Sequence, residues 1–256
     1  MKFAANIHYM FTEHAFLDRF AAAARAGFEG VEFPMPYGYP KETLAALLQE
    51  HGLTQTVFVL PSGDWDKGDR GIAIFPERQE EFCRGIDIAI DYAQALDCKM
   101  INCVPGMTQD KSRFGIFTDT LVSNLQYAAQ RLGEAGIKLL IEPANSKDFP
   151  GYFLETTTQA MALIEAVGSD NLFIEYDVYH MQIMEGDIAN TFRRLQERIA
   201  YIQIADVPGR HEPGTGELNY PFLLRRFEEL GYRGWVGAEY LPLGGTEAGL
   251  GWLDRV

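Results

Sequence analysis

The sequence contains no run of about 18 consecutive apolar residues, the length that a membrane-spanning helix requires. The first residues, MKFAANIHYMF, include an apolar stretch too short for a secretory signal, and His8 interrupts it. Cysteine is also scarce, because only Cys83, Cys98 and Cys103 are present, without the spacing of a zinc site. We therefore expect a cytoplasmic protein that has no membrane partner and keeps its thiols reduced and buried.

Basic side chains are few in comparison with acidic ones. Lys and Arg together number 22 and Asp and Glu 36, which gives a formal net charge of −14 at pH 7. Because nucleic-acid binding needs Lys and Arg gathered on one face, we expect no nucleic-acid partner. An anionic small molecule would need a local cation at its binding site. The sequence leaves the oligomeric state open, a homo-oligomer included.

Apolar, strand-like runs alternate with segments of helical periodicity along the whole chain. The predicted strands cover residues 3–10, 30–37, 54–60, 100–104, 138–142, 172–177, 200–206 and 235–240. The predicted helices cover residues 15–26, 41–52, 77–97, 119–136, 156–167, 188–199, 220–231 and 246–256. Glycine ends several of these helices, as in EAGIKLLIE and ELGYRGWVGAEY, because it adopts the left-handed conformation at no steric cost.

This alternation predicts the fold. Strands that alternate with helices pair in parallel through right-handed crossovers. Eight such units in 256 residues predict a (β/α)8 TIM barrel that forms one domain over residues 1–256. The alternative is a doubly wound open sheet. That fold would carry a glycine-rich phosphate loop after the first strand, and NIHYMFTEH contains no glycine.

Acidic and amide side chains lie at the ends of the later strands, where a TIM barrel carries its chemistry. Glu142 ends the fifth strand in KLLIEPAN, Asp177 the sixth and Glu239 the eighth, while Gln203 lies in the seventh. Three unpaired carboxylates at one rim would repel one another and raise their pKa values. All four side chains offer the oxygen ligands that Mg²⁺ or Mn²⁺ prefers, so we expect a divalent-metal site. For any one acid alone, a helix cap or an arginine partner is the alternative.

Two further polar side chains follow the same strands. His180 comes three residues after Asp177 in DVYH and could donate to a substrate oxygen. Arg210 lies in DVPGRHEPGTGELNY, a loop too long and too rich in Gly and Pro for a minimal connector. We expect its guanidinium to bind a substrate carboxylate, with a solvated loop charge as the alternative. Aromatic residues after three strands could wall a small pocket or pack in the core: Tyr37, Trp65 and Tyr240.

The segments IEPAN, DVYHMQ, YIQIADVPGRHEPGTGELNY and GWVGAEYLP resemble hydroxypyruvate isomerases and the similar 2-oxo-tetronate isomerases. FAANIHYMFTEHAFLDRFAAAARAGFEGVEF is also similar, so the resemblance covers essentially the whole chain. It implies the xylose isomerase-like TIM barrel, shared with sugar epimerases and the endonuclease IV type of DNA repair enzyme. It also implies roles for six residues: metal ligands Glu142, Asp177, Gln203 and Glu239, of which the two glutamates move protons, and substrate-binding His180 and Arg210. Many epimerases carry His in place of Gln203, which leaves the identity of the metal open.

The expected activity is metal-dependent isomerisation of a small hydroxy-keto acid through an enediolate, with hydroxypyruvate converted to tartronate semialdehyde (2-hydroxy-3-oxopropanoate). One glutamate would remove a carbon-bound proton and the other would return it to the neighbouring carbon. The alternatives on the same barrel are a 2-oxo-tetronate isomerase and a ketose 3-epimerase. An endonuclease IV-like enzyme is disfavoured by the net charge of −14 and by only five histidines. A non-catalytic sugar-acid-binding protein is disfavoured by the intact pair of glutamates.

Overall fold

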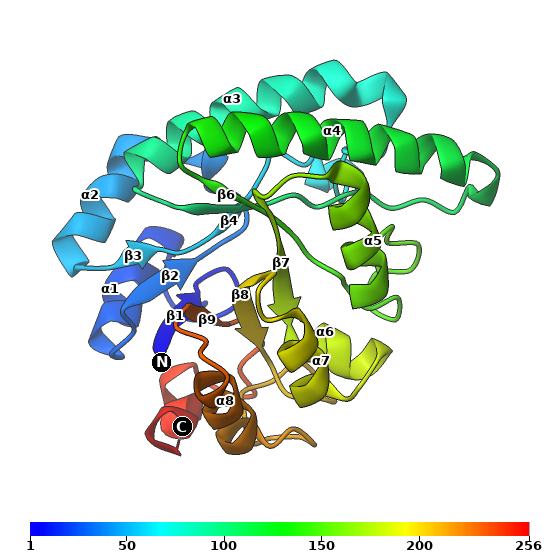
Figure 1. The fold of residues 1–256 in the computed structure, drawn as a ribbon. Helices are drawn as coiled ribbons and strands as arrows, with labels where there is room; N and C mark the ends of the chain where they lie inside the picture. The colour runs from blue at the N-terminus through cyan, green and yellow to red at the C-terminus, as the bar shows by residue number, and fades with distance from the viewer. Residues whose placement is uncertain (256) are drawn as a thin grey trace.

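The computed structural model describes residues 1–255, so the last residue of the predicted domain and of the predicted C-terminal helix, Val256, lies outside the described residues. Parallel strands form a ring at the centre of the molecule and helices surround it (Figure 1). The strands are β1 (Lys2–Asn6), β2 (Gly30–Glu32), β3 (Thr54–Gln55), β4 (Phe58–Val59), β5 (Met100–Asn102), β6 (Lys138–Ile141), β7 (Leu172–Asp177), β8 (Ile199–Ile204) and β9 (Trp235–Ala238). The predicted TIM barrel is confirmed.

The ring closes through the third predicted strand, which is split. Its halves β3 and β4 lie at the two ends of the strand order β3-β2-β1-β9-β8-β7-β6-β5-β4. β3 pairs with β2, and β4 pairs with β5. The Val59 amide also donates to the Pro34 carbonyl oxygen at 2.9 Å, which joins β4 to the segment that follows β2. This closure excludes the doubly wound open sheet.

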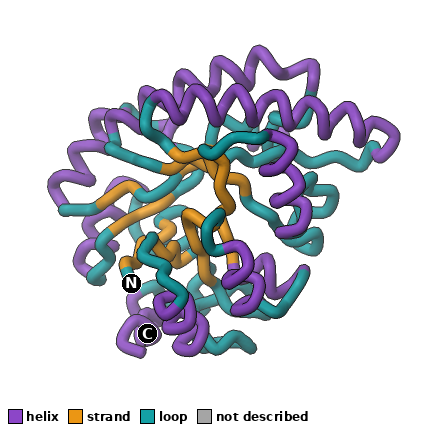
Figure 2. Tube along the Cα trace, viewed as in Figure 1, coloured by secondary structure: helices purple, strands orange, loops and turns teal. Residues whose placement is uncertain are grey.

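The helices are α1 (Arg19–Arg25), α2 (Lys41–His51), α3 (Gln79–Ala95), α4 (Phe114–Glu134), α5 (Thr157–Val167), α6 (Val178–Met184), α7 (Ile188–Leu195) and α8 (Tyr220–Glu229). They form the outer layer, seen as purple turns around the orange strands in Figure 2. Gly136 and Gly231 have positive φ values of 71° and 96° after α4 and α8, as the sequence predicts. Within residues 1–255, no helix is long and apolar enough to cross a membrane.

Three helix predictions differ from the structure. α4 begins at Phe114 rather than at residue 119, because a short 3-10 turn capped by Asp110 leads directly into it. α6 was not predicted, and it begins immediately after β7 because the Asp177 carboxylate accepts hydrogen bonds from the Tyr179 and His180 amides. The predicted last helix is a 3-10 segment, Glu247–Arg255.

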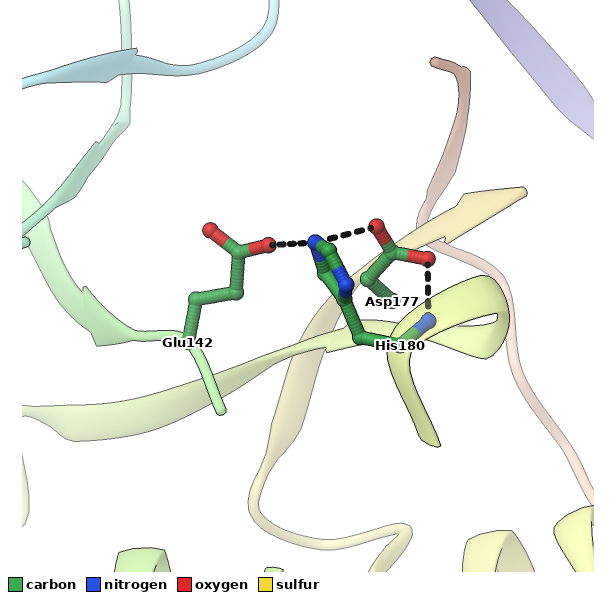
Figure 3. Close-up of side chains that lie close together, drawn as sticks. All are labelled: Glu142, Asp177 and His180. Atoms are coloured by element: carbon green, nitrogen blue, oxygen red, sulfur yellow. Dashed lines mark hydrogen bonds and ion pairs between the residues drawn. The ribbon is translucent and has the colours of Figure 1, made fainter. Parts of the chain in front are cut away.

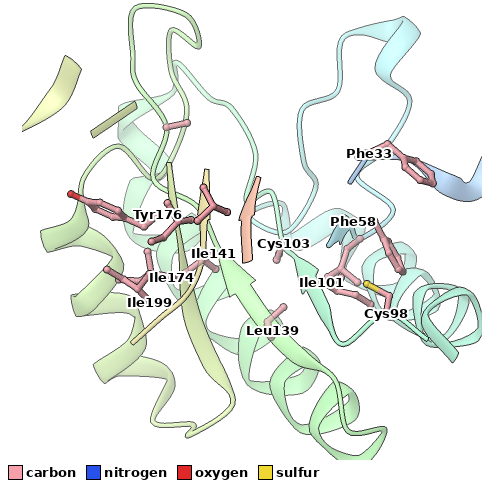
Figure 4. Packing of buried hydrophobic residues seen from close by; sticks show 14 of the residues in the cluster. Phe33, Phe58, Cys98, Ile101, Cys103, Leu139, Ile141, Ile174, Tyr176 and Ile199 are labelled. Carbon is pink, nitrogen blue, oxygen red and sulfur yellow. The ribbon is translucent and has the colours of Figure 1, made fainter. Parts of the chain in front are cut away.

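Alternation along the strands separates two environments. In β6, Leu139 and Ile141 belong to the apolar layer between barrel and helices, which Figure 4 shows in part. Leu140 belongs instead to a small cluster with Val57 and Tyr201 inside the barrel. Because successive side chains point to opposite faces, Glu142 continues the inward face that Leu140 begins. The strand pattern thus aims the carboxylate into the mouth of the barrel.

Candidate active site

Three predicted site residues meet at the ends of β6 and β7. Glu142 follows β6, Asp177 ends β7, and His180 lies in the first turn of α6. Figure 3 shows the imidazole of His180 between the two carboxylates. Its Nε2 lies 3.4 Å from Asp177 Oδ2 and 3.7 Å from Glu142 Oε1. One ligand atom from each of the three lies within 4.8 Å of the others, a spacing that would suit a metal ion.

Glu239 reaches the same rim from the end of β9, but a guanidinium separates it from this group. Arg210 Nη2 donates to Glu239 Oε2 and lies 3.5 Å from Asp177 Oδ2. The Arg210 side chain is only 11% exposed, and its guanidinium lies 5.3 and 5.2 Å from the ring centres of Tyr9 and Tyr179. Arg210 is therefore a buried partner of two carboxylates, which rules out the solvated loop charge.

Gln203 lies deeper in the barrel and has a fixed orientation. Its Nε2 donates to Glu32 Oε1 at 2.9 Å, while its Oε1 is buried without a hydrogen-bond partner among residues 1–255. Asn6 Nδ2 donates to the same Glu32 oxygen at 2.9 Å and to Glu239 Oε1 at 3.1 Å. Tyr201 donates its hydroxyl to Glu32 Oε2. Glu32 therefore turns the Gln203 amide so that its carbonyl oxygen remains open as a ligand.

Sequence reasoning did not select Glu32 or Asn6 as site residues. Glu32 ends the short run GVE and is 1% exposed, and Asn6 ends β1 and is 2% exposed. The criterion applied to the later strands, a polar side chain that closes an apolar run, would have found both. Glu175 met that criterion, and it also lies inside the barrel, 2% exposed, with Oε2 unpartnered among residues 1–255.

The protonation of the two glutamates reflects burial and like charge. Burial raises the pKa of Glu239 to about 8, a shift that nearby Arg210 opposes and Asp177 reinforces. Burial also raises the pKa of Glu142 well above its usual range, and the charges of Glu239 and Asp177 add to this. A divalent cation would relieve the repulsion, since it favours the ionised forms. Glu142 and Asp177 lie close enough to share such an ion, whereas Glu239 is held apart from them by Arg210 and Gln203 lies deeper in the barrel.

The His180 ring is held as one neutral tautomer. Burial lowers its pKa to about 4. Its Nδ1 faces the Asn145 side-chain nitrogen at 2.7 Å and accepts from the Asn145 backbone amide at 3.3 Å. The Asn145 amide cannot be reversed, because its Oδ1 already accepts from the Lys147 and Asp148 amides. With Nδ1 as acceptor, Nε2 carries the proton, so His180 presents a donor and not a metal ligand to the site.

A cavity of about 100 Å³ opens beside these groups. Four of its lining residues, His8, Pro34, Trp65 and Arg70, also line a larger open pocket beside it. Trp65 lines the cavity as the sequence suggested, whereas Tyr37 packs edge-on against Tyr92 and Tyr240 packs against Trp252 in the core. The polar side chains around it are His8, Tyr9, Arg70, Glu142, Tyr152, His180, Arg210 and Glu239.

Comparison with known proteins agrees with this architecture. Residues 20–256 match the family model described as xylose isomerase-like TIM barrel. The chain is 50% identical to hydroxypyruvate isomerase from Escherichia coli over 99% of its length and 98% of the relative. It is 46% identical to 2-oxo-tetronate isomerase from Cupriavidus necator over 98% of its length and 97% of the relative.

Solved structures share the same fold. The crystal structure of AP endonuclease, family 2, from Brucella melitensis has a TM-score of 0.97 and 45% identity over 99% of this chain and 98% of that one. The apo 3-keto-D-glucoside 4-epimerase from Escherichia coli, at 22% identity and full coverage of both chains, has a TM-score of 0.82 and shares the fold alone. The chain therefore belongs to the xylose isomerase-like TIM barrel family, in which it is an isomerase similar to hydroxypyruvate isomerase and 2-oxo-tetronate isomerase.

Proposed function

We propose that this protein is a metal-dependent isomerase of small hydroxy-keto acids, acting on hydroxypyruvate to give tartronate semialdehyde. The observation that carries the proposal is the small cavity whose wall holds Glu142 and Glu239 together with the neutral His180. Identity of 50% to a hydroxypyruvate isomerase over nearly the whole chain supports this substrate. A 2-oxo-tetronate, one carbon longer, is the alternative that 46% identity supports.

Glu142, Asp177, Gln203 and Glu239 would hold Mg²⁺ or Mn²⁺. Three carboxylates and one amide oxygen are hard ligands, and the unpartnered Gln203 Oε1 supports this assignment. When bound, the ion supplies positive charge that acidifies the substrate carbon and stabilises the enediolate. His180 is left out of this set because its Nε2 bears a proton.

Glu142 and Glu239 would transfer the proton. They approach the cavity from the ends of β6 and β9, which lie on different sides of Asp177. One carboxylate would remove the proton from the hydroxyl-bearing carbon, and the other, protonated beforehand, would donate its own proton to the former carbonyl carbon. The hydroxyl proton would pass to the former carbonyl oxygen, which completes the isomerisation. Burial raises the pKa of both carboxyls, that of Glu239 to about 8, so each can hold a proton at a pH where an exposed glutamate has lost it.

His180 and Arg210 would bind the substrate. The protonated Nε2 of His180 would donate to a substrate oxygen that becomes negative in the enediolate. The sequence predicts that Arg210 binds the substrate carboxylate. Because its guanidinium lies against Glu239 and Asp177, we assign it instead to the oxygens of the reacting carbons. Both side chains are pre-positioned by protein contacts, which lowers the cost of ordering them on binding.

The test is solvent-deuterium incorporation during hydroxypyruvate turnover by chelator-treated protein, with and without added Mg²⁺ or Mn²⁺. We expect isomerisation with deuterium at the reacting carbons, and only after metal is restored. Glu142→Gln and Glu239→Gln keep an oxygen but remove the base, so each should lower kcat by roughly 10²–10⁴ at saturating metal. Turnover by the chelated protein, or full rescue of either variant by metal, would contradict the mechanism.

DNA cleavage is the second candidate function, because the similar Brucella melitensis structure is named as an AP endonuclease. The net charge of −14 opposes it, since binding of a DNA strand needs a basic groove. Incubation of the metal-loaded protein with a DNA duplex that contains one abasic site distinguishes the nuclease from the isomerase. Strand cleavage that is lost in Glu142→Gln would favour the nuclease.

A further inference from the structure

The cavity has a second arginine that the catalytic group does not use. Arg70 lies in the loop after β4, is half-buried and lines the cavity together with Trp65. Arg210 is matched by Glu239 and Asp177, whereas no ion pair within residues 1–255 includes Arg70. A guanidinium that is partly desolvated and lacks an anionic partner is available for an anionic ligand.

The Arg70 guanidinium is held in place by contacts that leave one edge open. Its Nη1 donates to the backbone oxygens of Trp65 and Asp69 at 3.1 and 2.7 Å. Its plane lies over the Trp65 ring, 4.4 Å from the ring centre. Among residues 1–255, Nε and Nη2 have no acceptor. This pair of N–H groups is the edge with which arginine binds a carboxylate through two hydrogen bonds.

The loop that carries Arg70 is fixed before any ligand arrives. The Gly71 amide donates to the Ser62 carbonyl oxygen at 3.0 Å, which ties the two ends of the loop together. Asp69 accepts from Arg78 Nη1 and from the Asp64 amide, both at 2.8 Å. These contacts lie on both sides of Arg70 in the loop, so the protein fixes the direction of its side chain before a ligand binds. Little conformational entropy is then lost on binding.

The position of Arg70 also fits the geometry of the barrel. The third strand, which β3 and β4 share, lies four strands from β8 in either direction around the ring. Arg70 follows the third strand and Arg210 follows β8, so the two arginines approach the cavity from opposite sides. Arg210 is already paired with Glu239 and Asp177. Arg70 is the other arginine of the cavity wall, so it is the guanidinium left to meet the negative charge of a keto acid.

We propose that Arg70 forms a carboxylate subsite of the active site, receiving the C1 carboxylate of a short keto acid while the carbonyl and hydroxyl carbons face Glu142 and Glu239. The assignment rests on the proposed isomerase function and deepens it, because it makes the acid group, and not the chain length, the main determinant of substrate choice. A sugar of similar length that lacks the carboxylate leaves the Arg70 edge unpaired.

The test compares hydroxypyruvate with dihydroxyacetone, in which an uncharged hydroxymethyl group replaces the carboxylate. Arg70→Gln should lower kcat/KM for hydroxypyruvate by about 10- to 100-fold, the worth of a charged hydrogen-bond pair. The kcat/KM of Arg70→Gln for dihydroxyacetone should stay within about threefold of the wild-type value, since this substrate has no carboxylate to bind in the subsite. Arg70→Lys should keep part of the wild-type kcat/KM for hydroxypyruvate, because lysine has the positive charge but not the two parallel N–H donors of the guanidinium.

Lys67→Gln is the matched control. Lys67 lies in the same loop, its side chain is 82% exposed, and it does not line the cavity, so both substrates should keep their wild-type values. Equal losses for both substrates in Arg70→Gln would show a merely structural role and overturn the subsite. Equal losses in Lys67→Gln and Arg70→Gln for hydroxypyruvate would overturn it too, since long-range attraction would then explain the effect.

Binding of pyruvate, measured by calorimetry on the metal-loaded protein, separates the subsite from the proposed reaction. Pyruvate has the carboxylate and carbonyl but no hydroxyl, so it cannot isomerise. Weaker pyruvate binding in Arg70→Gln supports the subsite even where hydroxypyruvate fails as a substrate, an outcome that would refute only the proposed function. Unchanged pyruvate affinity overturns the subsite even where the wild type isomerises hydroxypyruvate.

Discussion

The role of His180 depends on which ring nitrogen carries its proton, and a neighbouring amide decides this. Asn145 donates to Nδ1 while its own oxygen accepts two backbone N–H groups, so neither partner can rotate without losing a bond. A neutral ring with this partner must bear its proton on Nε2, directed toward Asp177 and Glu142. In the proposed mechanism Asn145 is thus a positioning residue, because it leaves the His180 Nε2–H directed into the site as a donor and not as a metal ligand.

Asn145→Asp tests this arrangement, although it also replaces the Asn145 Nδ2 hydrogen bond to Asp148 Oδ2, 2.9 Å long, with two neighbouring carboxylates. Aspartate still accepts from the Lys147 and Asp148 amides, but it offers His180 an acceptor in place of a donor, so the proton moves to Nδ1. We expect kcat for hydroxypyruvate to fall by about 10- to 100-fold, the worth of the lost donor. Nitrogen-15 NMR of the imidazole should show the change of tautomer. An unchanged tautomer together with a reduced kcat would assign the loss to structure alone.

At the scale of elements, the loop from Ser62 to Gly71 shows how backbone packing directs a side chain. A Cβ on Gly71 would lie 2.3 Å from the Val104 carbonyl oxygen, and φ at Gly71 is 96°. Gly68 in the same loop has φ of 94°, but no atom would lie within 4 Å of its Cβ. Alanine would therefore be strained at both positions, but only at position 71 would its Cβ also clash with a neighbouring atom.

Substitution of these glycines by alanine separates the two effects. Gly68→Ala should lose about 1 kcal/mol of unfolding free energy from left-handed strain alone, with hydroxypyruvate kinetics unchanged. Gly71→Ala adds the clash, so we expect a larger loss of unfolding free energy and a raised KM for hydroxypyruvate, because Arg70 is displaced. Denaturant titration and steady-state kinetics measure both. Identical effects of the two substitutions would contradict a role for the Val104 contact.

The succession of strands and helices was predictable because each unit repeats the same physical signals. Apolar runs marked the strands, and glycines such as Gly136 ended the helices where a left-handed residue was required. α6 escaped prediction because its start depends on the Asp177 carboxylate, which the sequence presented as a metal ligand. The Asp177 side chain caps α6 and also faces the site. The spacing of residues in the sequence cannot show that one side chain has both roles.

The contacts among the site residues were less predictable than their location. Gln203 depends on Glu32, and Arg210 on Glu239, through pairs separated by 171 and 29 positions. Residues so far apart in the sequence show no periodic pattern that would predict their contact. They meet only because the strands close into a ring. Arg70 was not predicted because it lies in the loop after the third strand, and site residues were sought at the ends of the fifth to eighth strands. Asn6 and Glu32 end the first two strands and were missed because the same criterion was not applied there.

At the scale of the whole molecule, the interior of the barrel is an unusual core. Helices and strands bury an apolar layer outside the ring, while the inside holds Asn6, Glu32, Asn102, Glu175 and Gln203, each 5% exposed or less. Buried polar atoms without partners are costly. Among residues 1–255, Asn102 Oδ1, Glu175 Oε2 and Gln203 Oε1 are in that state. A cation bound beside these atoms should therefore stabilise the folded protein.

This balance predicts how the stability of the metal-free protein changes with pH. Burial raises the pKa of Glu239 from 4.5 to about 8, so between these values the native state binds a proton that the unfolded chain has lost. Unfolding free energy must then fall as pH rises through that window.

We expect the Tm of chelator-treated protein to fall between pH 6 and pH 8.5, by roughly 2–4 °C for each kcal/mol of unfolding free energy that is lost. Glu239→Gln, which does not titrate, should show a flatter profile, and Mg²⁺ or Mn²⁺ should raise the wild-type Tm more at pH 8.5 because the ionised ligands are already available. Parallel profiles for Glu239→Gln and wild type would contradict this account, since a Glu239 side chain that does not control the pH dependence is not held protonated at the rim.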